Sequence, residues 1–154
     1  MRAFGSPGAA ASDPGPASAS DGARLIRHPA VLWGVNEDTR LLLRGLLQLY
    51  RCPSVHEVSN LDELEALPSL SAPTVLVFDA ESPEWESDLA SALSARPELR
   101  GLVILPRDAT TLESRARAAG ASEIIYRPFA VHDFALAVAA TGDARPSPAD
   151  ASDF

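Results

Sequence analysis

Two side chains in this sequence combine a reactive type with a position where chemistry is often done. Asp79 directly follows the apolar run 74–78, and Arg127 directly precedes Pro128 and Phe129. A carboxylate at the end of a buried strand either holds a turn together or acts as a nucleophile that accepts a transferred group. The guanidinium of arginine is planar and always charged, and it suits two-point contact with a carboxylate. These two residues are therefore the first candidates for a functional site.

The other reactive side chains form no catalytic or metal-binding pattern. His28, His56 and His132 are scattered along the chain without metal-ligand spacing. Cys52 is expected to be a small buried hydrophobe rather than a nucleophile. No serine stands in a G-x-S-x-G motif, and residues 34–38 lack the glycines of a phosphate-binding loop. The sequence thus predicts no metal, no cofactor and no enzymatic activity.

Composition and charge exclude several classes of protein. The 154 residues carry 13 Lys and Arg against 21 Asp and Glu, a net charge of −8, which argues against a protein that tracks a nucleic-acid backbone. A single cysteine excludes an intramolecular disulfide and a cysteine-based zinc cluster. No apolar run approaches the ~18 residues of a membrane span, and the N-terminal residues contain no signal-peptide core. We therefore expect a cytoplasmic protein that binds neither nucleic acid nor membrane.

The composition divides the chain into three segments. Residues 1–29 are rich in Gly, Pro, Ala, Ser and Asp, and residues 142–154 have the same character. Such segments bury too little apolar surface to offset their conformational entropy, so both are predicted to be disordered arms. Residues 30–141 are predicted to form one folded domain. Because no further domain is expected after it, the module is predicted to stand alone.

Within residues 30–141, short apolar runs alternate with amphipathic segments. The apolar runs predict five strands, at 30–35, 54–58, 74–78, 102–105 and 122–126. The amphipathic segments predict five helices, at 38–50, 60–67, 84–95, 110–119 and 131–140. This alternation implies right-handed crossovers and a parallel sheet covered by helices on both faces. The predicted architecture is flavodoxin-like α/β, in which ligands collect outside the carboxyl ends of the strands.

The first and last helices give the clearest expectations about which side chains are buried. Asp38 is expected to cap the first helix, and Thr110 to open the fourth through a capping box. The buried face of the first helix is predicted to comprise Thr39, Leu42, Leu43, Leu46, Leu47, Leu49 and Tyr50. The buried face of the last helix is predicted to comprise Val131, Phe134, Ala135 and Val138. Leu41 and Leu136 fall outside these faces and are predicted to be exposed.

Three segments of the sequence resemble the receiver domains of two-component response regulators, the chemotaxis type included. They are VLWGVNEDTRLLLRGLL, TVLVFDAESP and GASEIIYRPF. In that family the matching segments hold an acidic pair before the first helix, the phospho-accepting aspartate, and a lysine–proline–phenylalanine turn. The resemblance covers residues 30–141 and implies a (βα)5 fold with a five-stranded parallel sheet. It places Asp79 at the acceptor position and implies a cis peptide bond between Arg127 and Pro128.

The departures from the family pattern concern the residues that would handle phosphate. Gly34 and Val35 stand at the acidic-pair positions, and neither side chain offers the oxygen that Mg²⁺ prefers. Pro106 stands where the family has threonine or serine, so the hydroxyl is missing. Arg127 replaces the family lysine, and Ile124 replaces the switch aromatic. The degenerate site therefore lacks most of the groups that phosphoryl transfer uses.

These departures predict a pseudo-receiver, a signalling module that binds another protein without being phosphorylated. Without a metal, Asp79 needs another cation if it is buried and charged, so we expect it to pair with Arg127. Two alternatives remain open. One is a receiver that accepts phosphate on Asp79 from a histidine kinase. The other is a small-molecule sensor that uses the crevice at the strand ends.

The partner surface is expected on the fourth helix, the fifth strand and the fifth helix, the face that the resembled family often uses. Its candidate contact residues are Leu136, Tyr126 and Leu112. Leu136 has small apolar alanines as neighbours, which leaves an uncharged outer helix face. Leu41 is the competing candidate on the first helix. The occupant is expected to be a protein partner or a second copy of this chain.

Overall fold

Five parallel strands form a single sheet in the computed structural model, which describes residues 26–34, 36–70 and 73–144. In chain order the strands are β1 (Ala30–Trp33), β2 (Val55–Val58), β3 (Thr74–Asp79), β4 (Leu99–Leu105) and β5 (Ala121–Tyr126). They lie side by side in the order β2-β1-β3-β4-β5, and every neighbouring pair is parallel. The predicted flavodoxin-like architecture is confirmed.

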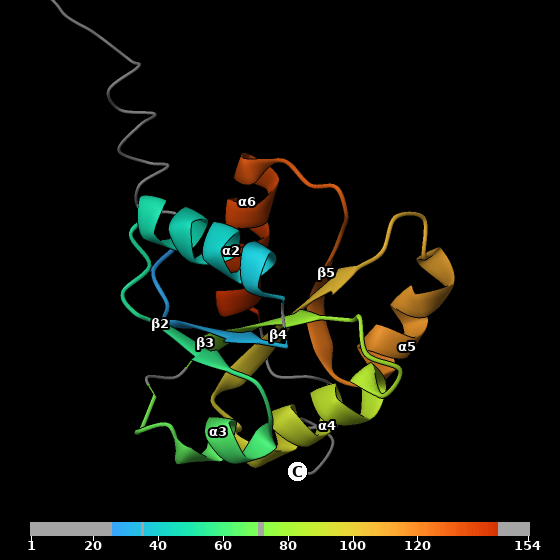
Figure 1. Ribbon diagram of the computed structural model, residues 1–154, viewed down its shortest axis with the longest axis horizontal. Helices are drawn as coiled ribbons and strands as arrows, with labels where there is room; N and C mark the ends of the chain where they lie inside the picture. The colour runs from blue at the N-terminus through green and yellow to red at the C-terminus, as the bar shows by residue number, and fades with distance from the viewer. Residues whose placement is uncertain (1–25, 35, 71–72, 145–154) are drawn as a thin grey trace, which may run out of the picture.

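Helices cover both faces of the sheet (Figure 1). One face carries α2 (Glu37–Leu49) and α6 (Val131–Gly142). The other carries α3 (Leu61–Ala66), α4 (Trp85–Ala95) and α5 (Glu113–Ala118), the last preceded by a 3-10 turn at Thr110–Leu112. In the described part of the chain, no helix has the length and apolar character to cross a membrane.

Each face of the sheet has its own hydrophobic core because successive residues of a strand point to opposite faces. In β3, Val75 and Val77 pack under α2 and α6, whereas Leu76 and Phe78 pack under α3, α4 and α5. All residues of β3 are buried, as expected for a central strand covered on both sides. The strand therefore carries Asp79, its last residue, into the interior.

Several helix and strand boundaries differ from those predicted, and three of the differences have a clear local cause. Asn36 rather than Asp38 caps α2, because its side-chain oxygen accepts a hydrogen bond from the Thr39 backbone N–H at 2.9 Å, while Asp38 already lies in the first turn. Thr110 lies inside a 3-10 turn, so it is not the extended residue that a capping box requires. β4 begins at Leu99 rather than residue 102, since Gly101 pairs with β3 although its lack of a side chain hides the strand pattern.

Three side chains predicted to be buried are exposed. On α2, Leu42 is 57% and Leu49 is 66% exposed, since only a narrow stripe around Leu43 packs on the sheet. Both lie about 100–120° around the helix from Leu43, outside that stripe. Val131 is 44% exposed because it is the first residue of α6, where packing on the sheet has only begun. Leu41 and Leu136 are exposed, as predicted.

The packed part of the chain extends beyond the predicted limits of 30 and 141. Ile26 is buried in the core under α2 and α6, and the Pro29 carbonyl accepts a hydrogen bond from the Val75 N–H at 2.9 Å. At the other end, α6 continues to Gly142. Most of the two predicted arms, residues 1–25 and 145–154, lies outside the described residues.

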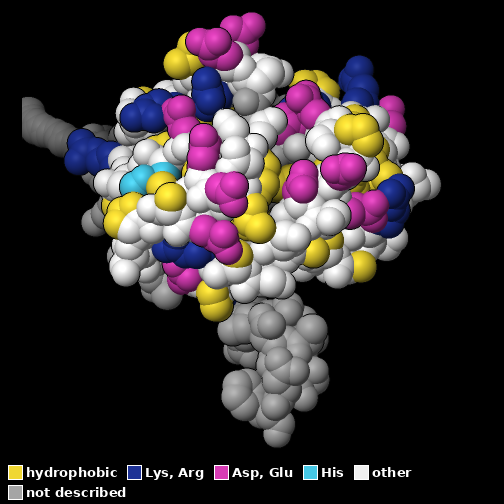
Figure 2. Space-filling model, turned by 60° about the horizontal axis from the view of Figure 1, so that its bottom comes forward, with side chains coloured by type: hydrophobic (Ala, Val, Ile, Leu, Met, Phe, Trp, Pro, Cys, Tyr) yellow, Lys and Arg dark blue, Asp and Glu magenta, His cyan; other side chains and the backbone are white. Residues whose placement is uncertain are grey.

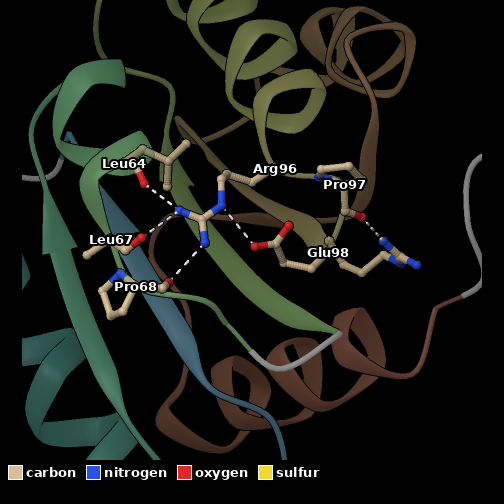
Figure 3. Close-up of polar contacts among 7 residues, drawn as sticks. Leu64, Leu67, Pro68, Arg96, Pro97 and Glu98 are labelled. Carbon is tan, nitrogen blue, oxygen red and sulfur yellow. Dashed lines mark hydrogen bonds and ion pairs between the residues drawn. The ribbon is translucent and has the colours of Figure 1, made fainter.

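A half-buried arginine ties the end of α3 to the loop between α4 and β4 (Figure 3). The Arg96 guanidinium donates to the backbone carbonyls of Leu64 at 2.8 Å, Leu67 at 3.2 Å and Pro68 at 3.0 Å. It also pairs with Glu98 at 2.9 Å. Carbonyls at a helix C-terminus have no partner within the helix. Arg96 therefore satisfies the end of α3 and fixes its position under the sheet.

Candidate functional site

The candidate site lies where β1, β3 and β4 end, because the register of the sheet aligns their carboxyl ends. Trp33 pairs with Phe78, and Phe78 pairs with Val103. Asp79 is the last residue of β3, and its side chain is completely buried. This edge of a doubly wound sheet is where ligands and chemistry collect.

The predicted ion pair between Asp79 and Arg127 is present. A guanidinium nitrogen of Arg127 bonds Oδ2 of Asp79, whereas Oδ1 is buried and has no hydrogen-bond partner among the described residues. The Arg127 backbone N–H donates to the Leu105 carbonyl at 3.0 Å, which fixes the arginine at the end of β4. The Arg127–Pro128 bond is cis, as the resemblance implied.

Burial governs the electrostatics of Asp79. Loss of water around the carboxylate raises its pKa above the ordinary value of 3.8, and the hydrogen bond and charge of Arg127 oppose this shift. Glu81 also raises the Asp79 pKa, and its carboxylate lies 3.6 Å from the Arg127 guanidinium. The Arg127 guanidinium therefore interacts with two carboxylates, the fully buried one of Asp79 and the exposed one of Glu81.

Glu81 is a site residue that the sequence analysis missed. It lies two residues past the end of β3, and its side chain reaches the same guanidinium that holds Asp79. The signal in the sequence was the short spacing of two acidic residues across a strand end, which places both near any cation at that edge. Nothing in the sequence tells which of the two a cation will approach more closely.

Several solved structures resemble this chain. A response regulator receiver protein from Burkholderia phymatum superposes with a TM-score of 0.64 at 20% identity, covering 78% of this chain and 98% of that one. A CheY-like protein, TadZ from Pseudomonas aeruginosa, gives 0.58 at 21% identity, covering 70% and 93%. The beryllofluoride-activated NtrC4 receiver domain, solved as a dimer, gives 0.62 at 20% identity, covering 75% and 96%. No protein-family model and no curated protein matches the sequence.

The chain has the receiver-domain fold. In this fold, Asp79 occupies the end of the central strand, the position of the family acceptor in the resemblance drawn from the sequence. The identities are too low to transfer activity, so the residues of this chain must be judged by their own chemistry.

The residues at the acidic-pair positions do not fit a magnesium ion. Gly34 follows β1 with a positive φ of 70° and offers no side-chain oxygen. Val35 lies outside the described residues. Asn36 uses its side-chain oxygen to cap α2, and Asp38 is exposed on that helix. Magnesium is usually held by one or two carboxylates together with waters and substrate oxygens. Here Asp79, the carboxylate that ends β3, is already bound to the Arg127 guanidinium, and Glu81 lies 3.6 Å from the same group.

The remaining degenerate positions are also poorly suited to a phosphoryl group. Pro106 directly follows β4, is exposed, and accepts a hydrogen bond from the Ala109 N–H at 3.2 Å through its carbonyl. The resulting turn contains no hydroxyl at that position. Ile124 is half-buried on β5 and packs against the core under α3, α4 and α5. As an aliphatic side chain, it has no polar group with which to report a change at Asp79.

Of the three candidate contact residues on the α5–β5–α6 face, Leu136 alone is exposed, and the other two are half-buried. Leu136 is 45% exposed on α6. Leu112 is half-buried and packs against the core below. The Tyr126 hydroxyl donates to a carboxylate oxygen of Glu113 at 2.6 Å, and this hydrogen bond raises the pKa of the tyrosine. The face thus presents one exposed leucine on α6, beside a polar contact within the chain between β5 and α5.

The histidines and the cysteine do not converge. Within the described ranges, no group of three His, Cys, Asp or Glu side chains could hold a metal ion. His28 bonds Asp143 at 3.1 Å. The Cys52 thiol is half-buried and donates to the carbonyls of His28 and Ser54, each at 3.3 Å. Burial raises the pKa of this thiol, which disfavours the nucleophilic thiolate and suits a structural cysteine.

Proposed function

We propose that this chain is a non-enzymatic signalling module that uses the receiver fold to bind a partner protein and does not depend on phosphorylation. The observation that carries the proposal is the ion pair between Asp79 and Arg127. It occupies the place where an active receiver would need a free carboxylate, and it supplies the positive charge that a metal would otherwise bring.

The chemistry of phosphoryl transfer supports this assignment. A carboxylate that attacks a phosphoryl donor needs cations to neutralise the transferring oxygens. Gly34 and Pro106 contribute neither a metal ligand nor a hydroxyl. The Arg127 guanidinium is engaged by Asp79 and lies 3.6 Å from Glu81. Attack by Asp79 would require this ion pair to break, and Gly34 and Pro106 offer no ligand for a metal ion that could take the place of the guanidinium.

The face formed by α5, β5 and α6 is the proposed partner surface. Leu136 is exposed on α6, next to the small residues Ala137 and Ala140. On α5 the charged side chains already have partners, since Arg115 bonds Glu86 in two places and Arg117 lies 3.8 Å from Glu113. A partner protein that covers this surface can therefore bury Leu136 without breaking new charges away from α5.

A receiver phosphorylated on Asp79 is the second candidate. Asp79 ends the central strand, and its Oδ1 has no hydrogen-bond partner within the described residues, so one oxygen is available for chemistry. Amide chemical shifts distinguish the two candidates when the isotopically labelled protein is titrated with Mg²⁺ and beryllofluoride. We expect no saturable shifts around Asp79 and Arg127. Saturable shifts at these positions, absent from Asp79→Asn, would favour the phosphorylated receiver.

A further inference from the structure

α2 carries an unusual concentration of exposed leucines. Five large hydrophobic side chains are exposed in the described part of the chain, and three of them are Leu41 at 61%, Leu42 at 57% and Leu49 at 66%. All three lie on this one helix, whose opposite side packs on the sheet. Scattered exposed leucines need no explanation, whereas three on one helix face do.

Gly45 lies at the centre of this leucine face. With 100° of rotation per residue, Leu41, Leu42 and Leu49 all fall within about 60° of Gly45 around the helix. A Cβ at Gly45 would meet no other atom within 4 Å, so packing within the chain does not require a glycine. Glycine weakens a helix relative to alanine. Its value at this position is that it allows another backbone to come close.

The leucine face is free of charge at its centre. Arg40 and Arg44 lie beside it, but both turn toward β2 and pair with Glu57, at 3.3 Å and 2.6 Å respectively. By contrast, acidic side chains are spread over the face covered by α3 and α4, which Figure 2 shows. In a chain of net charge −8, two copies repel each other least where the surface carries no charge.

We propose that two copies of this chain associate through α2. The α2 helices of the two copies pack antiparallel, about a two-fold axis that passes beside Gly45. Leu41 and Leu49 lie four residues to either side of Gly45, so each Leu41 meets Leu49 of the other copy. Leu42 then lies beside Gln48 of the other copy. A two-fold contact requires a surface that is complementary to itself, and Leu41 and Leu49 at equal spacing from Gly45 meet that requirement.

Charge complementarity favours a second copy over another occupant and fixes the antiparallel direction. Asp38 is exposed at the start of α2, and Arg51 is exposed just past its end. Neither forms an ion pair with another described residue. The antiparallel arrangement brings Asp38 of one copy beside Arg51 of the other, twice. A parallel arrangement would instead bring the two Asp38 carboxylates together.

Sedimentation velocity of the full chain over a wide range of concentrations tests the proposal. We expect a concentration-dependent dimer, and we expect Leu41→Glu and Leu49→Glu each to weaken association at least tenfold while the circular dichroism spectrum is unchanged. Leu136→Glu is the matched control, an equal change at an exposed leucine of α6, and it should leave the dimer intact. A monomer at every concentration, or a dimer disrupted by Leu136→Glu and not by Leu41→Glu, would overturn the proposal.

Three further variants test the geometry. Asp38→Arg should weaken the dimer several-fold, and adding Arg51→Asp should restore it, since the reversed charges again face each other. In a Cys52→Ala background, Gly45→Cys should form an intermolecular disulfide on mild oxidation, because the two copies are closest there. A dimer that forms no such disulfide and is indifferent to charge reversal uses another surface. None of these readouts involves Asp79, so their failure leaves the proposed function standing.

Discussion

Arg127 holds Oδ2 of Asp79 and leaves Oδ1 of the same buried carboxylate without a hydrogen-bond partner among the described residues. The arginine is itself anchored, because its backbone N–H bonds the Leu105 carbonyl at the end of β4. The pair therefore joins the carboxyl ends of β3 and β4, the edge at which doubly wound sheets bind ligands. Burial of the Asp79 carboxylate makes its contact with Arg127 important for stability, and it also makes the charged form of Asp79 costly to bury.

Removing only the arginine should destabilise the fold. Arg127→Ala leaves the Asp79 carboxylate buried without a cation, and such changes cost about 3–5 kcal/mol when both partners are buried. Because the Arg127 side chain is 28% exposed, we expect the lower end of this range, visible as a clear fall in melting temperature. Arg107→Ala, at an exposed arginine, is the control and should change little. Equal melting temperatures for the two variants would mean that solvent screens the pair.

The stability of the protein should depend on pH through Asp79. Burial raises the pKa of Asp79 in the folded state above 3.8, so the folded chain holds this proton more tightly than the unfolded chain. The stability that Asp79 contributes is therefore fully present below pH 3.8 and is lost as pH rises through the raised pKa. Asp79→Asn lacks this titration and keeps an oxygen for Arg127.

Urea unfolding of both proteins at a series of pH values measures this difference. Asp79→Asn should gain in free energy of unfolding relative to the wild type as pH rises from about 4, with a plateau once Asp79 is ionised. Asp108→Asn, at an exposed carboxylate, controls for the loss of one negative charge. If instead the free energy of unfolding of the wild type increases relative to that of Asp79→Asn as pH rises, the attraction between Asp79 and Arg127 outweighs the cost of burying the charge.

The network around Arg96 should need a guanidinium and not merely a positive charge. Arg96 donates to three backbone carbonyls and to Glu98 from different nitrogens, a geometry that the single ammonium of lysine does not reproduce (Figure 3). Arg96→Lys should lower the free energy of unfolding by about 1–3 kcal/mol, since buried carbonyls at the end of α3 lose their donors. Arg107→Lys, at an exposed position, should be neutral. A neutral Arg96→Lys would show that water replaces the lost donors at no cost.

The partner surface is tested at Leu136. A negative charge at this exposed position should leave folding intact and remove the partner, because Leu136 is the apolar contact that we propose on the α5–β5–α6 face. Recovery of bound proteins by the wild type, Leu136→Glu and Leu41→Glu, compared by quantitative mass spectrometry, measures this. We expect specific partners to be lost with Leu136→Glu alone. Partners lost with Leu41→Glu and kept with Leu136→Glu would place the binding surface on α2.

Much of the fold could be predicted from the sequence because its strands are short apolar runs between amphipathic helices. Prediction failed where the pattern of apolar residues was the same for two different structures. Gly101 has no side chain to show that it belongs to β4. On α2, Leu42 and Leu49 are as apolar as Leu43, and only their angular position relative to the sheet separates exposed from buried leucines.

The candidate site was predictable in part. The pairing of Asp79 with Arg127 followed from the need of a buried carboxylate for a cation. The second contact of Arg127 with Glu81 did not, because the direction of an exposed side chain after a strand end depends on the local turn. Asn36 was missed as the cap of α2 because Asp38, two residues further on, is an equally good capping residue.

The claim that this receiver fold works without phosphorylation is tested most directly by intact mass. The full chain is incubated with acetyl phosphate and Mg²⁺, with a response regulator known to accept phosphate treated in parallel. The account predicts an unchanged mass for the wild type, identical to that of Asp79→Asn. A stoichiometric gain of about 80 Da, the mass of one phosphoryl group, that is absent from Asp79→Asn would show a carboxylate still able to attack and would contradict it.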